Sequence, residues 1–376
     1  MEAYLDNSAT TKVCEAAIEK MCFCMREMWG NPSSLHAKGI EAGGLLEEAR
    51  KTAAAFLGAE PKEIYFTSGG TESNNLAIRG AALKNRRNGK KIVTDTIEHA
   101  SVMSTVDELE KAGFEVVRLS PGKDAKISES ELENAIDENT VLVSLMAVNN
   151  EVGSIQPFDR VKSIIKMKRS PALLHVDAVQ AFGKMPLKPH STGIDLLTAS
   201  SHKIHGPKGA GLLFVSEKAK ISPVTFGGEQ EKRLRPGTEA MPAVVGFGEA
   251  IRQLPNVNEQ LKIMTRLRND FVLRLRAAEG VYINSPDDAL PYIVNISLDR
   301  MRSETVLNFL SAAGIYVSSG SACAKGHKSH VLEAMRLDEN RIDGALRVSL
   351  SRYTTAEELD FFTEEITRAM KTLRKR

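Results

Sequence analysis

Apolar residues in the larger, N-terminal part of the chain fall into short continuous runs separated by helix-spaced stripes. The short runs, which are typical of buried strands, are residues 63–67, 91–94, 141–148, 173–176 and 194–197. Amphipathic stretches accompany these runs, such as residues 45–57 before the first run, which Gly58 ends. Because strand and helix patterns alternate from about residue 15 to residue 255, we expect an α/β fold with a mostly parallel sheet wrapped by helices.

The pattern changes after Leu254-Pro255-Asn256, which we interpret as a domain boundary. Near the end of the chain, Thr355 is followed three residues later by Glu358, a capping box that opens a last helix. The elements expected between these points are a helix over residues 258–278, a strand over 292–298, a helix over 303–313 and a strand over 346–350. Together they predict a smaller α+β domain.

Polar residues follow four of the strand-like runs. They are residues 98–101, 149–151, 177–180 and 200–209. In an open α/β sheet, ligands bind beyond the carboxyl ends of the strands. We therefore expect the four groups to converge on one binding site.

A candidate anion site follows residues 63–67, where Ser68-Gly69-Gly70 precedes a helix that begins at Thr71. Free N–H groups and the helix dipole at such a start favour an anion. No lysine follows the glycines, and the spacing Gly-x-Gly-x-x-Gly is missing, so neither a Walker P-loop nor a dinucleotide fingerprint is present. On its own, the segment also fits an ordinary capped helix after a glycine turn.

Lys203 lies in residues 199–209, among hydroxyl, imidazole and glycine residues. A lysine that forms a Schiff base needs a fixed position, a neighbouring phosphate site and space for a flat ring. It reacts only when neutral, so its surroundings must lower its pKa by desolvation or by a nearby positive charge. The segment alone fits a solvated loop equally well, and the other polar groups favour the Schiff base.

Composition narrows the class of protein further. The 376 residues carry a net charge of +2, from 50 basic and 48 acidic residues, so no direct binding of nucleic acid is expected. Four cysteines without zinc-ligand spacing fit a reducing cytoplasm and predict no metal site. The first residues lack the features of a signal peptide, and no apolar run approaches the ~18 residues of a membrane helix. We therefore expect a cytoplasmic protein with room for two domains.

Taken together, these motifs resemble the NifS/IscS-type cysteine desulfurases of the class V aminotransferase family, which are fold-type I pyridoxal-phosphate (PLP) enzymes. The resemblance runs from residue 4 to about residue 352 in family order, over residues 4–11, 30–36, 67–75, 149–153, 175–180, 201–203, 235–238 and 318–323. It implies a large PLP-binding domain over residues 15–255 with a seven-stranded sheet. Residues 1–14 and 256–376 would form the small α+β domain, with the catalytic cysteine in a loop at about 318–330.

The resemblance implies a role for each matched residue. Lys203 would form the Schiff base and move the substrate proton, Asp177 would keep the pyridinium nitrogen protonated, and His99 would stack on the ring. Without the other motifs, His99 would be interpreted as an ordinary histidine at a helix start, and Asp177 fits a strand-end acid that caps a helix. Gln180 and Asn149 would hold the phenolic oxygen and the substrate region. The phosphate would be bound by Gly70, Thr71, Ser200 and His202, together with Thr238 from the neighbouring subunit of a homodimer.

Cys323 sets the substrate that the resemblance implies. Its surroundings, residues 318–330, are polar and basic, which predicts an exposed loop and favours a thiolate. The thiolate would take the sulfur of L-cysteine as a persulfide and release L-alanine. Cys14, Cys22 and Cys24 instead lie in a helix-like apolar stretch, where a buried cysteine is ordinary.

Arg347 matches the family arginine that binds the substrate carboxylate, a bidentate contact that suits a guanidinium. The alternative is an arginine paired with a local acid. The persulfide would pass to an acceptor protein, either a scaffold for Fe–S cluster assembly or a tRNA sulfurtransferase. Cys323 would ligate an Fe–S cluster only transiently, during transfer.

Two departures from the family pattern bear on these expectations. The interval from Cys323 to residues 329–332 is slightly shorter than in the housekeeping Fe–S-assembly members, which leaves the transfer partner open. Pro236 replaces the usual serine before Gly237-Thr238 and should stiffen that turn. Two other functions stay open: a selenocysteine lyase or another fold-type I lyase, and, in a different class, a non-catalytic scaffold of a sulfur-transfer complex.

Overall fold

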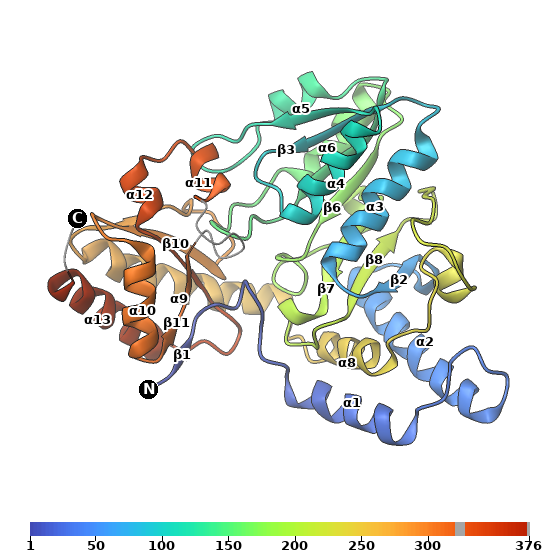
Figure 1. Cartoon of the computed structure of the whole chain (residues 1–376), viewed down its shortest axis with the longest axis horizontal. Helices are drawn as coiled ribbons and strands as arrows, with labels where there is room; N and C mark the ends of the chain where they lie inside the picture. Colours follow the sequence, from blue (N-terminus) through green and yellow to red (C-terminus); the bar gives the residue numbers. More distant parts are fainter. Residues whose placement is uncertain (320–327, 374–376) are drawn as a thin grey trace.

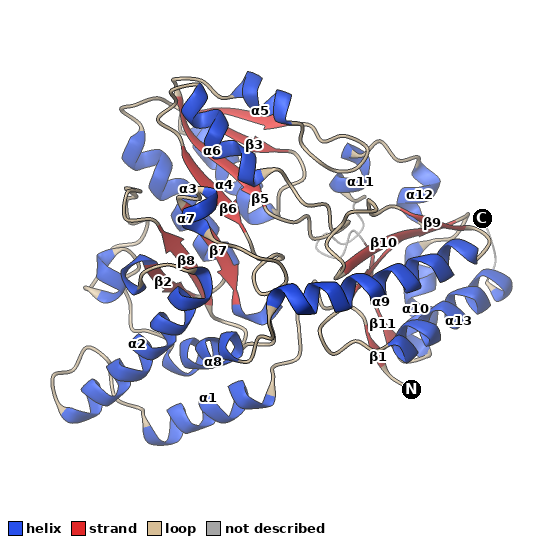
Figure 2. Cartoon of the chain, turned by 180° about the vertical axis from the view of Figure 1, so that it is seen from behind, coloured by secondary structure: helices blue, strands red, loops and turns tan. Residues whose placement is uncertain are grey.

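The computed structural model describes residues 1–319 and 328–373. Figure 1 and Figure 2 show two groups of elements side by side: a larger group built on a long sheet, and a smaller group beside the two labelled termini. The long helix α9 (Val257–Ala277) leads from the first group into the second.

The larger group is built on a sheet of seven strands in the order β2-β8-β7-β6-β5-β3-β4. Strand β8 runs antiparallel to both of its neighbours, and the other pairings are parallel. The expected seven-stranded, mostly parallel sheet is therefore confirmed. The strands are β2 (Ile64–Thr67), β3 (Lys91–Asp95), β4 (Glu115–Leu119), β5 (Thr140–Met146), β6 (Leu173–Asp177), β7 (Leu196–Ser200) and β8 (Gly211–Val215).

Helices cover both faces of this sheet, because successive strand residues point to opposite sides. Leu196 of β7 packs with Leu76 in the apolar cluster under α3 and α4, whereas its neighbour Leu197 packs with Phe158 in the cluster under α2, α6 and α8. The helices of the larger group are α1 (Glu15–Glu27), α2 (Ala37–Leu57), α3 (Gly70–Asn85), α4 (Ala100–Lys111), α5 (Glu129–Ala135), α6 (Phe158–Met167), α7 (Pro189–Thr192) and α8 (Met241–Arg252).

The smaller group holds an antiparallel sheet of order β12-β13-β10-β9, and β1 from the N-terminus pairs in parallel with β11. Its strands are β1 (Ala3–Tyr4), β9 (Val281–Ile283), β10 (Ile293–Leu298), β11 (Ile315–Tyr316), β12 (Ser318–Ser319) and β13 (Ala345–Ser349). Its helices are α9, α10 (Ser303–Ala312), α11 (His330–Ala334), α12 (Glu339–Asp343) and α13 (Ala356–Thr372). The division of the chain into domains at residue 256 stays a prediction.

Several element ends follow from local chemistry that the sequence reveals. Gly58 ends α2 with a φ of 67°, in the left-handed region that glycine adopts without strain. The capping box of Thr355 and Glu358 opens α13 as expected. Strand β7 begins at Leu196, later than the expected run over 194–197, although the Asp195 N–H already donates to the Leu174 carbonyl at 3.0 Å.

None of the helices in the described part of the chain combines the length and apolarity that crossing a bilayer requires.

Candidate active site

Polar residues that follow several strands of the large sheet meet in one cleft of about 350 Å³. Its walls come from the residues after β2, β3, β5, β6 and β7, from the N-terminal segment and from β13 of the smaller group. Those residues lie together because parallel strands present their carboxyl ends at the same edge of the sheet. The described lining residues are Ser8, Ala9, Gly70, Thr71, Asn74, His99, Ser101, Met146, Val148, Asn150, Asp177, Val179, Gln180, Ser200, His202, Lys203 and Arg347.

Lys203 lies in the turn that follows β7, and its amine is fixed by the N-terminal segment. The Nζ atom donates to the backbone carbonyls of Ser8 and Ala9, the latter at 2.8 Å. Thr11 anchors the two segments to each other, since its N–H donates to the His202 carbonyl at 2.9 Å. The lysine is therefore positioned by residues from the far N-terminus, which the sequence order does not suggest.

Asp177 ends β6 with a carboxylate that is 6% exposed. Its Oδ2 atom accepts from Asn74 Nδ2 at 2.7 Å, and its Oδ1 atom accepts from the Val179 N–H at 2.9 Å. Asn74 Nδ2 also donates to Ser101 Oγ at 2.8 Å. The carboxylate is held in a fixed orientation at the wall of the cleft, where it can pair with a cationic group.

His99 is the residue before α4 and caps that helix. Its Nδ1 atom accepts from the Ser101 N–H at 3.1 Å. Burial lowers the pKa of His99; the Asp177 charge opposes this shift, and the charges of Lys203 and His330 add to it. The imidazole is therefore neutral at pH 7, and it lines the cleft as an uncharged ring.

The start of α3 and the end of β7 form one corner of the cleft. A Cβ atom on Gly70 would lie 2.8 Å from Val179 Cγ2 and 3.8 Å from Ser200 Cβ, so only glycine leaves this corner open. Burial lowers the pKa of His202 to about 4, and its Nδ1 atom lies 3.1 Å from Thr10 Oγ1. The corner offers backbone N–H and hydroxyl donors to an anion.

Gln180 and Lys184 lie next to each other behind Lys203. Gln180 Nε2 donates to the Ser8 carbonyl at 3.0 Å, and its Oε1 atom accepts from Lys184 Nζ at 3.4 Å. Burial lowers the pKa of Lys184 to about 7, and the charges of Lys203 and Arg347 act in the same direction. Lys184 is therefore a buried basic side chain close to Lys203.

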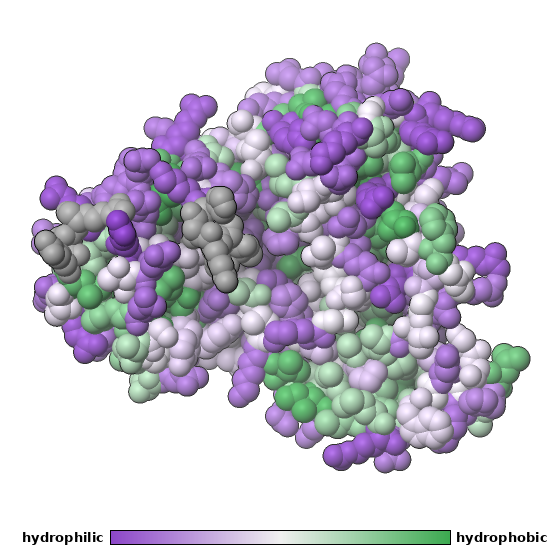
Figure 3. All heavy atoms as spheres, viewed as in Figure 1, coloured by the Kyte–Doolittle hydropathy of each residue, from purple (hydrophilic) through white to green (hydrophobic). Residues whose placement is uncertain are grey.

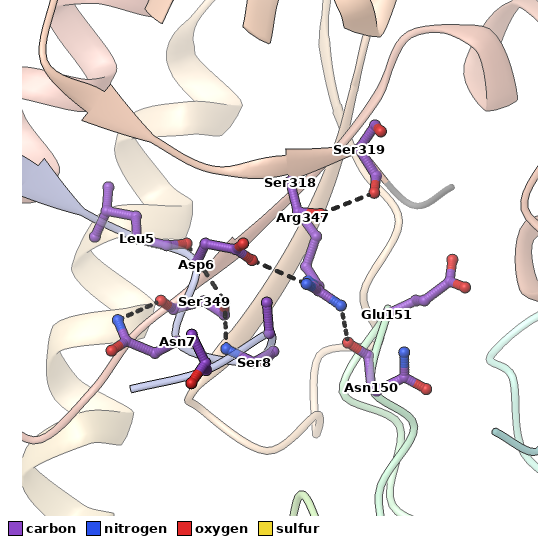
Figure 4. Close-up of polar contacts among 12 residues, drawn as sticks. Leu5, Asp6, Asn7, Ser8, Asn150, Glu151, Ser318, Ser319, Arg347 and Ser349 are labelled. Atoms are coloured by element: carbon purple, nitrogen blue, oxygen red, sulfur yellow. Dashed lines mark hydrogen bonds and ion pairs between the residues drawn. The ribbon is translucent and has the colours of Figure 1, made fainter. Parts of the chain in front are cut away.

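Arg347 in β13 joins three segments at the edge of the cleft (Figure 4). Its Nη2 atom donates to Asp6 Oδ1 at 2.9 Å, and its Nη1 atom donates to the Asn150 carbonyl at 3.1 Å. The side chain is only 7% exposed, and its Nε atom has no hydrogen-bond partner in the described part of the chain. The arginine therefore pairs with a local acid, Asp6, and also lines the cleft. Pairing with a local acid and a position suited to substrate binding, which the sequence presented as alternatives, occur together.

Asn149 is fully buried and does not line the cleft. Its Oδ1 atom accepts from the N–H groups of Glu151 and Val152 at 2.9 and 3.1 Å, and its Nδ2 atom donates to the Ile97 carbonyl at 3.1 Å. The adjacent Asn150 lines the cleft in its place. The Asn149 amide therefore stabilises the turn after β5. The expected contacts of Asn149 with cofactor and substrate stay a prediction.

Two further predicted site residues lie apart from the cleft or outside the structure. Thr238 is exposed and does not line the cleft of its own chain. Cys323 lies outside the described residues. Of the other cysteines, Cys24 is buried, whereas Cys14 and Cys22 are half-buried and free. Among the residues that the structure describes, no three His, Cys, Asp or Glu side chains lie close enough to hold a metal ion.

Several residues that build the site have no role that the sequence predicts. Ser8 and Ala9 lie in the N-terminal motif, but they contact Lys203 through their backbone carbonyls. Every residue has such a carbonyl, so the side chains at these positions do not reveal the contact. Asn74 gives a weak signal, because four residues after Gly70 it returns to the same face of α3. Lys184 gives none, since a lysine in a turn is ordinarily solvated.

Comparisons with known proteins agree on one family. The model of the family described as aminotransferase class-V matches residues 3–362. The chain is 42% identical to a protein of Methanosarcina thermophila named cysteine desulfurase IscS, over 99% of this chain and 92% of that protein.

Solved structures agree with this assignment. One described as a NifS-like protein is 39% identical, with a TM-score of 0.94 over 99% of this chain and all of that chain. Another, described as SspA in complex with cysteine, is 34% identical, with a TM-score of 0.83 over 94% of this chain and 100% of that chain. With the family model spanning both groups of elements and these likenesses spanning nearly the whole chain, this protein belongs to the class-V aminotransferase family and, within it, to the PLP-dependent cysteine desulfurases.

Proposed function

We propose that this chain removes sulfur from L-cysteine, releasing L-alanine and leaving a persulfide on Cys323. The observation that carries the proposal is the arrangement of Lys203, Asp177 and Arg347 around one cleft. An amine fixed by two carbonyls, a buried carboxylate and a guanidinium are the groups that an amino acid and a pyridine cofactor require.

The cleft fits pyridoxal phosphate. When bound, this cofactor would supply an aldehyde that reacts with amines and a ring that withdraws electrons from the substrate Cα. Lys203 would hold the aldehyde, and Asp177 would pair with the ring nitrogen. The corner that Gly70 keeps open beside Ser200 would receive the phosphate, with Thr71 and His202 as further donors. The neutral ring of His99 would lie against the cofactor ring, and Gln180 would bind its phenolic oxygen.

The side chains of the cleft divide the remaining work. Arg347 would bind the substrate carboxylate through two parallel hydrogen bonds, which fixes the amino acid at its Cα. The Lys203 amine would take the Cα proton as a general base. Because Nδ1 of the neutral His99 ring accepts from the Ser101 N–H, Nε2 carries the hydrogen and would donate it to the substrate.

The sulfur step balances without an outside oxidant. The Cys323 thiolate would attack the sulfur of L-cysteine, so that an S–S bond forms while the C–S bond breaks. The electron pair of that bond stays on the substrate Cβ, which takes up a proton as L-alanine leaves. We propose that the persulfide then passes to a cytoplasmic acceptor protein, either an Fe–S scaffold or a tRNA sulfurtransferase.

We also propose a homodimer in which Thr238 reaches the phosphate of the neighbouring subunit. Thr238 is exposed and lies away from its own cleft, which is what donation to a partner requires. Apolar side chains gather along the lower edge in Figure 3, over α1 and the start of α2. An exposed apolar surface of this kind supports a subunit contact. Its large exposed residues are Ile18, Phe23, Met25, Trp29, Leu35 and Ile40.

Two variants test the proposed chemistry. Purified protein should be yellow, and borohydride or the substitution Lys203→Ala should remove the colour. Cys323→Ser should keep the colour but lose sulfide release from L-cysteine. Full sulfide release by Cys323→Ser would remove that residue from the mechanism, and a colourless preparation of wild-type protein supplied with the cofactor would favour a scaffold. Trapping a mixed disulfide at Cys323 from cell extract would then identify the acceptor.

A further inference from the structure

Three consecutive residues outside the cleft adopt a left-handed backbone conformation. Glu231, Lys232 and Arg233 have φ angles of 44°, 57° and 65°, and none of them is glycine. The Cβ atom makes this conformation costly for each residue, so a run of three persists only where the surroundings impose it. The run lies in residues 229–239, which we call the Thr238 segment.

Buried polar contacts hold the first residue of this run. The Glu231 side chain is 2% exposed, and Arg50 binds it with two nitrogens at 2.9 and 2.7 Å. Its Oε2 atom also accepts from the Phe66 N–H at 2.9 Å. Phe66 belongs to β2, the strand that leads directly into Ser68-Gly69-Gly70 at the phosphate corner.

The next residue is held against the same strand. Lys232 Nζ donates to the Lys62 carbonyl at 2.6 Å and lies 4.9 Å from the centre of the Tyr65 ring. The strained run therefore contacts β2 and the residues just before that strand, and it does not line the cleft.

A second ion pair connects the Thr238 segment to the start of α3. Arg235 Nε lies 2.8 Å from Glu72 Oε1, and Glu72 Oε2 accepts from the Ser68 N–H. Glu72 is in the first turn of α3, next to Thr71 of the cleft. An uncompensated carboxylate there would repel a bound phosphate, and the Arg235 charge neutralises it.

We propose that Arg50–Glu231 and Glu72–Arg235 form a clamp that holds the Thr238 segment on the phosphate-binding turn and sets the affinity for the cofactor. The four residues act by positioning, because none of them lines the described cleft. The inference rests on the proposed function in one respect, namely that Thr238 serves the phosphate of the neighbouring subunit. The clamp then connects the phosphate corner of one subunit to the residue that it donates to the other.

The test measures the dissociation constant for pyridoxal phosphate by titration of apoprotein, followed by absorbance. Glu231→Ala and Arg235→Gln should each raise this constant at least tenfold. The double variant Glu72→Gln/Arg235→Gln should recover part of that loss, because it removes the carboxylate that Arg235→Gln leaves uncompensated. A merely structural role for Arg235 predicts no such recovery.

A matched control comes from the ion pair between Lys62 and Glu217, which joins neighbouring segments but has both side chains mostly exposed. Glu217→Ala should bind the cofactor as the wild type does. Circular dichroism of each apoprotein checks folding, and if Glu231→Ala does not fold, Arg235→Gln and the double variant still decide.

The outcomes separate the clamp from the donated threonine. If Glu231→Ala and Arg235→Gln bind normally while Thr238→Ala binds weakly, the clamp is overturned and the donated contact stands. If Thr238→Ala also binds normally, the donated contact itself fails. Equal weakening by Glu217→Ala would overturn the clamp as well, because any surface ion pair would then have the same effect.

Discussion

At the scale of single residues, His99 combines two functions that different atoms carry. Its Nδ1 atom caps α4 through the Ser101 N–H, while its ring lines the cleft. Asparagine also caps helices well, whereas alanine does not. The two functions should therefore separate when each replacement is made at this position.

We expect His99→Asn to keep the stability of the wild type, and His99→Ala to lose about 1 kcal/mol of the free energy of unfolding. Both variants should lose activity by roughly 100-fold or more, since neither side chain can exchange a proton as imidazole does. Urea denaturation of the apoproteins and assays of alanine release make the comparison. Equal activity in His99→Asn and wild type would reduce His99 to a cap.

Gly70 carries a second prediction at this scale. A Cβ atom there would press on Val179 Cγ2 at 2.8 Å, in the corner proposed for the phosphate. Gly70→Ala should weaken cofactor binding about tenfold, because overpacking costs about 1–3 kcal/mol. The double variant Gly70→Ala/Val179→Ala should restore binding, since it removes the atom that clashes. Weak binding in both, measured by cofactor titration, would show that the N–H direction and not the space matters.

The sequence predicts some residues of the site better than others, for physical reasons. Lys203 and Asp177 are predictable because Lys203 follows a buried strand and Asp177 ends one, and the carboxyl ends of parallel strands meet at one edge. The choice between Asn149 and Asn150 is not predictable, because a turn of unknown geometry decides which side chain faces the cleft. Lys184 escapes prediction as well, since its burial depends on segments far away in the chain.

At the scale of elements, β6 shows which structural features a hydrophobic pattern predicts and which it does not. Its apolar run predicts a strand, which the structure confirms, but the run does not predict that His175 within it is fully buried. There Ser144 Oγ lies 2.8 Å from Nδ1, and Thr198 Oγ1 lies 3.1 Å from Nε2. The partners sit on β5 and β7, so only the strand order reveals them. The same holds for the antiparallel direction of β8, which a local pattern does not encode.

Burial lowers the pKa of His175 to about 3 from its ordinary value of 6.5. Between these values the unfolded chain binds a proton that the folded chain does not, so the histidine makes the protein less stable as the pH falls. His175→Gln lacks this dependence. We therefore expect the stability of wild type relative to His175→Gln to fall by up to about 1.4 kcal/mol per pH unit below pH 6.5.

Urea denaturation of both apoproteins at pH 7.5, 6.0 and 5.0 measures this difference. Parallel curves for wild type and His175→Gln would mean that His175 takes up its proton in the folded state.

At the scale of the whole molecule, the site depends on segments that the chain order separates widely. Asp6 and Arg347 form an ion pair beside the cleft, and β1 pairs with β11 in the smaller group. A family resemblance gives the order of the sequence motifs along the chain, but it does not show which strands pair or which charged residues form ion pairs. The proposed donation of Thr238 extends this dependence to a second subunit.

Donation of Thr238 makes a prediction that a single subunit cannot fulfil. Homodimers of Lys203→Ala lack the amine in both sites, and homodimers of Thr238→Ala lack the donated hydroxyl in both. In a mixed dimer, the Thr238→Ala subunit keeps its own Lys203 and receives an intact Thr238 from the Lys203→Ala subunit. One complete site is thereby rebuilt, while the other lacks both groups.

We expect mixed dimers, purified through a different affinity tag on each subunit, to bind one cofactor per dimer with the affinity of a wild-type site. The Thr238→Ala homodimer should bind about tenfold more weakly, which corresponds to about 1.4 kcal/mol for one lost contact to a charged group. If Thr238 served its own subunit, the mixed dimer would hold no complete site and would bind as weakly as that homodimer. The affinity of the mixed dimer therefore decides whether each cleft is completed by its own chain or by the neighbouring one.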